Sequence, residues 1–143
     1  MHTRRRGQSI YYKKEEEMKS FIVALILFFG VITGVTLLSL RNVRAVSAIR
    51  DEVAAFTDAY PTMSNGAARD RLSAIIETWD EESPRLAYSV NRRELASIDT
   101  ALCEARGALV GGDGALFLSA MHALAARIQE LYELVGVRPQ NIL

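Results

Sequence analysis

Cysteine and lysine are scarce in this sequence, and neither net charge nor alternating strand patterns are present. The single cysteine, Cys103, cannot form an internal disulfide, so cysteine usage does not indicate a compartment. Seventeen Lys and Arg residues balance seventeen Asp and Glu residues, which gives no net field to attract nucleic acid. Since no stretch alternates apolar and polar residues, the sequence predicts helices rather than a sheet.

One long apolar run is present, FIVALILFFGVITGVTLLSL at residues 21–40. Its twenty positions contain no charged residue and no Asn, Gln or Pro. At about 1.5 Å per residue, a helix of this length covers about 30 Å, the thickness of a bilayer's hydrocarbon core. A core helix of a soluble protein would have a polar face, and this run has none. We therefore predict a transmembrane anchor over residues 18–40, with the lipid bilayer around it.

Lysine occurs only before this run, at residues 13, 14 and 19, whereas eleven arginines follow residue 20. The letters KKEEE ahead of Met18 correspond to a purine-rich string of the kind that a bacterial ribosome recognises upstream of a start codon. We interpret residues 1–17 as a translated ribosome-binding region, with the physiological protein starting at Met18. The alternative is a genuine cytosolic tail whose basic residues bind anionic lipid headgroups.

A start at Met18 makes the apolar run either a cleaved signal peptide or an uncleaved signal anchor. Residues 46–48, VSA, form a tolerable cleavage sequence, but the run exceeds the usual length of about 7–15 residues, and Arg41 and Arg44 lie in between. We favour the anchor. The flanking charges slightly favour a cytoplasmic C-terminus, whereas a free amino terminus resists translocation and long domains cross regardless of charge. We expect the bundle to be extracytoplasmic.

Residues 41–143 are expected to form a separate helical domain. Apolar residues at spacings of three and four mark one face of each of four segments. These faces comprise Val46, Ile49, Val53, Phe56 and Tyr60; Leu72, Ile75, Ile76, Trp79, Leu86 and Val90; Leu95, Ile98, Leu102, Ala105 and Leu109; and Phe117, Met121, Leu124, Ile128, Leu131 and Val135. Short connections between them predict an all-α fold, an antiparallel bundle of three to four helices behind one transmembrane helix.

Proline, glycine and aspartate punctuate these segments. Pro61 ends the first, and PTMSNG forms a turn. At Pro84 either a new helix begins with Ser83 as its cap, or one helix kinks, and we favour a kinked or closely restarted helix. The glycines at 111–112 end the third segment, and Asp113 caps the fourth.

No arrangement of residues predicts catalysis. His122 has no Cys, His or carboxylate three or four positions away, and the acidic residues 80–82 point in different directions on a helix. The GGDG sequence at 111–114 follows a helix rather than a strand, and no GK[ST] accompanies it. We expect no enzyme activity, cofactor, metal or small-molecule substrate.

Contact with another protein is the function that the sequence favours. Gly30 and Gly34 are four residues apart in the apolar run, a spacing that lets two membrane helices approach closely. The expected partner is another membrane protein or a second copy of this chain. The alternative is a small extracytoplasmic sensor or ligand-binding bundle with a pocket that includes Trp79, Tyr88 and Arg92.

Four features together resemble a known family. They are the N-terminal span, the tryptophan on the second helical segment, the ELASIDTAL sequence at 94–102 and the C-terminal residues 141–143, NIL. The chain from Met18 to Leu143 resembles the bacterial family called domain of unknown function 4363, short one-span proteins of Bacillota. The resemblance brings no known activity. It implies a membrane-anchored helical protein that acts beside other membrane proteins.

Overall fold

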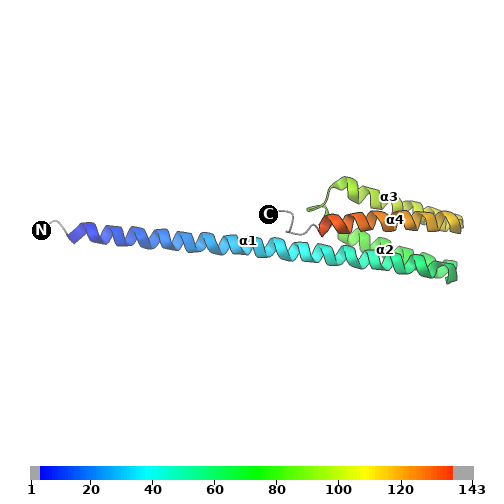
Figure 1. Cartoon of the computed structure of the whole chain (residues 1–143), viewed down its shortest axis with the longest axis horizontal. Helices are drawn as coiled ribbons and strands as arrows, with labels where there is room; N and C mark the ends of the chain where they lie inside the picture. The colour runs from blue at the N-terminus through cyan, green and yellow to red at the C-terminus, as the bar shows by residue number, and fades with distance from the viewer. Residues whose placement is uncertain (1–3, 137–143) are drawn as a thin grey trace. The chain divides into compact units, whose positions relative to one another are not determined.

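The structure of the chain is a computed structural model that describes the backbone of residues 4–136 and the side chains of residues 16–136. It contains four α-helices, α1 (Arg4–Ala59), α2 (Asn65–Leu86), α3 (Arg92–Gly111) and α4 (Gly114–Val135), and the 3-10 helix η1 (Tyr60–Thr62) among these residues (Figure 1). The predicted all-α fold is confirmed. The chain divides into two compact units, Met1–Leu38 and Ser39–Leu143.

The first unit is the N-terminal part of α1, and it contains most of the apolar run. Every residue from 16 to 38 is exposed to the surroundings. This part of α1 is long and apolar enough to cross a membrane, and none of its most apolar stretch is buried. The unit is therefore a candidate membrane span, as the composition of residues 21–40 predicted.

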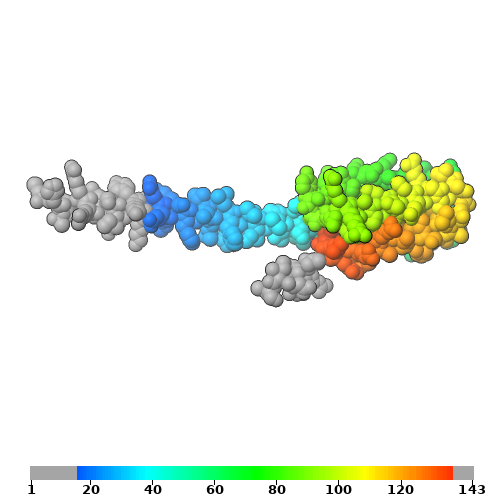
Figure 2. Space-filling model, turned by 90° about the horizontal axis from the view of Figure 1, so that it is seen from above, coloured from blue at the N-terminus to red at the C-terminus, as the bar shows by residue number. Residues whose placement is uncertain are grey.

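The second unit is a bundle in which the last part of α1 and the helices α2, α3 and α4 alternate in direction (Figure 1). Among the contacts between its helices, those of α3 with α4 are the most extensive, and Figure 2 shows their surfaces touching along the helices. The predicted apolar faces form one core. Nearly all of their residues are buried, while Tyr60, Ile76, Val90 and Val135 are half-buried and pack against the core.

Side-chain caps and one glycine fix where the helices of the bundle begin and end. Ser64, Asn91 and Asp113 each accept a hydrogen bond from a backbone N–H in the first turn of α2, α3 and α4, respectively. The bond to the Asp113 carboxylate from the Leu116 N–H is 2.9 Å long, so the predicted cap is confirmed. Gly112 ends α3 with a φ of 74°, a conformation that glycine adopts without steric cost.

The α2–α3 connection settles the alternatives at Pro84. Helix α2 passes through Pro84 and ends at Leu86, so no new helix starts from Ser83. Proline has no N–H to donate to the carbonyl four residues earlier, so α2 lacks that hydrogen bond in its last turn. Leu86 is buried, residues 87–90 form a turn, and Asn91 caps α3. The chain reverses direction between α2 and α3, and the apolar residues on both sides of the turn, Leu86 and Leu95, belong to the same core.

Candidate functional site

Gly30 and Gly34 lie in the exposed span, one helical turn apart on α1. A Cβ atom built on either glycine would meet nothing within 4 Å. Positions i and i+4 share a face of a helix, so the two glycines form a shallow notch between the larger side chains. This notch would let the backbone of another helix approach closely. Whether a helix occupies it stays a prediction.

The three predicted pocket residues lie in two different environments. Trp79 is on α2 in the core, with 1% of its surface exposed, and its Nε1–H donates a hydrogen bond of 2.5 Å to Asp99 Oδ1 on α3. Tyr88 lies in the α2–α3 turn and is 89% exposed. Arg92 is exposed in the first turn of α3. Trp79 thus joins two helices, and Tyr88 and Arg92 face outward close to each other along the chain.

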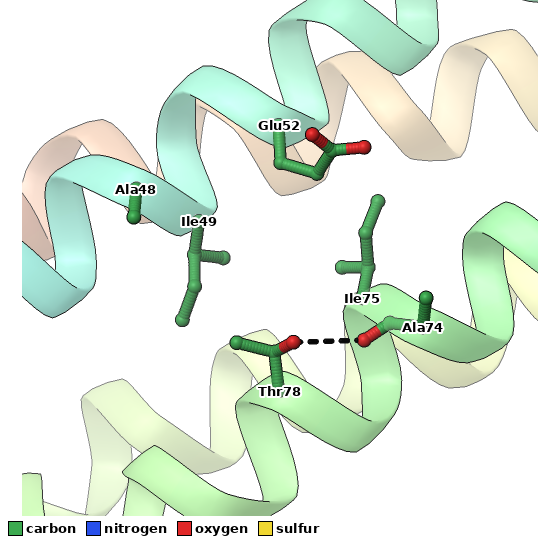
Figure 3. Close-up of a pocket in the computed structure, with 6 residues that line it drawn as sticks. All are labelled: Ala48, Ile49, Glu52, Ala74, Ile75 and Thr78. Atoms are coloured by element: carbon green, nitrogen blue, oxygen red, sulfur yellow. Dashed lines mark hydrogen bonds between the residues drawn. The ribbon is translucent and has the colours of Figure 1, made fainter.

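A groove between α1 and α2 has a volume of about 310 Å³. Ile49 extends from α1 toward α2, and Ile75 extends from α2 toward α1 (Figure 3). Each isoleucine is preceded by an alanine, Ala48 or Ala74, whose small side chain leaves space beside it. The groove is lined by Ala48, Ile49, Glu52, Ala74, Ile75 and Thr78.

The polar side chains of this groove already have partners in the protein. Glu52 Oε1 accepts a hydrogen bond of 2.8 Å from Arg71 Nε, and the two groups form an ion pair. The Thr78 hydroxyl donates to the Ala74 carbonyl at 2.9 Å (Figure 3). A ligand would therefore meet mainly apolar surface, whereas small-molecule sites usually add a few polar groups that fix orientation.

Sequence reasoning did not find this groove. It assigned Ile49 and Ile75 to apolar faces correctly, because both are buried. Periodicity shows which side of a helix is apolar, but it does not show which helix covers that side. The sequence feature that could have indicated the groove is the small residue, Ala48 or Ala74, before each isoleucine.

Besides the Glu52–Arg71 ion pair with α2, two polar contacts join α1 to the α2–α3 turn and to α4. Asn42 is buried on α1, and its Nδ2 donates a hydrogen bond of 3.0 Å to the hydroxyl of Ser89 in the α2–α3 turn. The Arg50 guanidinium lies 4.2 Å from the ring centre of Tyr132 on α4. A hydrogen bond to Asp51 raises the pKa of Arg50 above its ordinary value. The guanidinium is cationic at any physiological pH, so its contact with the ring is a cation–π interaction.

Possible metal-ligating side chains do not form a cluster within the described residues. Among residues 16–136, no three His, Cys, Asp or Glu side chains gather as a metal ion would need. Cys103 and His122 are both exposed, on α3 and α4. Three features of the described residues are considered for a function below: the glycine notch, the α1–α2 groove and the exposed turn at Tyr88.

No protein-family model matches the chain, and no curated protein or solved structure matches it either.

Proposed function

We propose that this protein is a single-span membrane anchor whose helical bundle serves an accessory role, binding another membrane protein or a second copy of the chain. Its work in this proposal is contact rather than catalysis. The observation that carries the proposal is the exposure of the apolar run, in which every residue from 21 to 40 is accessible. Soluble proteins rarely expose an apolar surface of this size, so lipid or a partner helix must cover it.

The glycine notch supports pairing inside the membrane. Lipid chains are as apolar as the helix, so the hydrophobic effect does not drive two spans together. Close packing does, and it requires small residues at the point of contact. Gly30 and Gly34 supply such residues, with nothing within 4 Å of a Cβ at either position.

Paired substitutions on two neighbouring faces test this proposal. We expect Gly30→Leu with Gly34→Leu to keep the protein in the membrane, because leucine favours insertion, and to reduce its co-purification with a partner or with a tagged second copy. The matched control is Val31→Leu with Val35→Leu, which has the same spacing on an adjacent face of the helix. Equal recovery of partner by both double variants would show that the notch is not the contact.

The bundle supplies the second candidate function. The α1–α2 groove could hold an apolar ligand, which would make the protein a small sensor or ligand-binding bundle. The capture experiment separates the two proposals. If the wild-type protein retains neither a partner nor a second copy under mild extraction, the contact proposal fails and the ligand-binding alternative takes its place.

We also propose that the chain is a relative of domain of unknown function 4363, the family that it resembles. Two of the features that carry the resemblance meet in the structure, since Trp79 bonds to Asp99 within the ELASIDTAL segment. A third, the C-terminal NIL, lies outside the described residues. The proposal predicts that relatives aligned over α2 and α3 keep a donor and an acceptor at these two positions.

A further inference from the structure

We propose that the end of the bundle formed by the α2–α3 turn rests on the headgroups of the membrane that the span crosses, and that anionic lipids strengthen this contact. The contact surface consists of residues 39–44 at the start of the bundle's part of α1 and residues 85–93 around the turn. The inference rests on the proposed membrane anchoring.

The hydrogen bond between Asn42 and Ser89 places the turn beside the first residues of the bundle. Asn42 follows the apolar run by only two residues, so it stands at the membrane surface if that run fills the hydrocarbon core. Its buried Nδ2 donates to the Ser89 hydroxyl at 3.0 Å. Ser89, 47 residues further along the chain, therefore lies at the same level as the start of the bundle.

Tyr88, the residue before Ser89, fits a headgroup environment. It is 89% exposed in a domain whose other aromatic side chains from residue 39 onward are buried or half-buried. An aromatic ring with a polar hydroxyl is at its most stable between lipid and water, and tyrosine is enriched at membrane interfaces for this reason. Contact with headgroups would cover a ring that the bundle leaves exposed.

Arginine is the charged residue of the proposed contact surface, and Glu94 lies next to it, lining a groove with Ser89, Val90 and Asn91. Residues 39–44 and 85–93 together contain five arginines and no Asp or Glu. Arg85 bonds to Glu82 at 2.8 Å, while Arg41, Arg44, Arg92 and Arg93 are exposed. Guanidinium groups bind phosphate with two parallel hydrogen bonds. Lipid phosphates close to the membrane end of the bundle are suitable partners for them.

A fluorescent probe next to Tyr88 tests this inference in the full-length protein. We would replace Cys103 with serine and Ala87, which is exposed, with cysteine, and attach an environment-sensitive dye. The reference is the same dye on the native Cys103, eleven residues beyond Arg92 and therefore about 16 Å further along α3. Both proteins are reconstituted into vesicles with nitroxide-labelled headgroups, with and without phosphatidylglycerol.

The expected result is a blue-shifted and more strongly quenched dye at position 87 than at Cys103, with a larger difference in anionic vesicles. Arg92→Gln with Arg93→Gln should remove the extra quenching that phosphatidylglycerol causes. The matched control is Arg69→Gln with Arg106→Gln, which removes two arginines outside the proposed contact surface. These arginines line a groove between α2 and α3 with Leu72 and Leu109, and their loss should leave the extra quenching unchanged. Replacing Tyr88 with serine should lower the quenching in both kinds of vesicle.

Two failures are distinguishable. Equal quenching at positions 87 and 103 in protein that floats with the vesicles would overturn this inference and leave the anchor intact. Protein that does not float with the vesicles at all would refute the proposed membrane anchoring, and with it this inference.

Discussion

At the scale of single residues, the hydrogen bond between Trp79 and Asp99 connects two helices of the bundle, α2 and α3. Trp79 is the only tryptophan, and it is buried in the core on α2. A buried N–H without an acceptor costs about 1–3 kcal/mol, so the ring needs a partner at this position. The carboxylate of Asp99 provides that partner from the edge of the core at 2.5 Å. The pair thereby joins α2 to α3.

Removing the acceptor should destabilise the bundle. We expect Asp99→Leu to lower the free energy of unfolding by about 1–3 kcal/mol, because the Trp79 N–H would stay buried without a partner. Asp99→Asn is the control, since its amide oxygen can still accept the bond and most of the stability should remain. Urea titrations of the full-length protein in mild detergent, followed by Trp79 emission, measure both. A leucine variant as stable as the asparagine variant would contradict this role.

At the scale of helices, the apolar faces determine which side of each helix is buried. On α4, Phe117, Met121, Leu124, Ile128 and Leu131 are all buried, while Leu116 lies off the face and is exposed. Whether a leucine on α4 is buried or exposed therefore depends on its position in the helical repeat.

Truncation on this face should be costly, and truncation off it should not. We expect Leu124→Ala and Leu131→Ala each to lower the free energy of unfolding by about 2–5 kcal/mol, because each leaves a cavity in the core. Leu116→Ala on the same helix should change it by less than about 0.5 kcal/mol. Thermal unfolding monitored by circular dichroism compares the three. If all three variants have the same melting temperature, the buried face contributes little to the stability of the bundle.

The helices could be predicted from sequence because each apolar face is a local pattern. The faces of Leu95–Leu109 and Phe117–Leu131 were confirmed residue by residue, and the cap at Asp113 followed from residue type. Contacts across the bundle could not be predicted, because Asn42 and Ser89 are 47 positions apart and periodicity does not pair helices. The groove at Ile49 and Ile75 was missed for the same reason.

At the scale of the whole molecule, the two units bury apolar surface in different ways. The bundle has its own core, with 22 buried apolar residues from Val46 to Leu131. The span has none of its most apolar stretch buried within the described structure. Folding therefore buries the apolar side chains of the bundle, whereas those of the span stay exposed. This difference is what a membrane anchor with a separate domain requires.

The proposed orientation places the bundle outside the cytoplasm. Cys103 is the only cysteine and it is exposed on α3, so its reactivity reports its location rather than its burial. We expect a membrane-impermeant maleimide to label it in intact cells as fully as in permeabilised cells. Labelling that requires permeabilisation would reverse the orientation and leave the fold unchanged.

Alkaline carbonate extraction of membranes that contain the full-length protein tests the membrane anchor most directly. The anchor predicts that the protein stays in the membrane pellet. Phe29→Arg with Ile32→Arg should release it, because each arginine near the centre of a span costs about 2.5–3.5 kcal/mol of insertion free energy. Leu116→Arg, on the exposed side of α4, should not release it. Recovery of the wild-type protein in the carbonate supernatant would contradict the account.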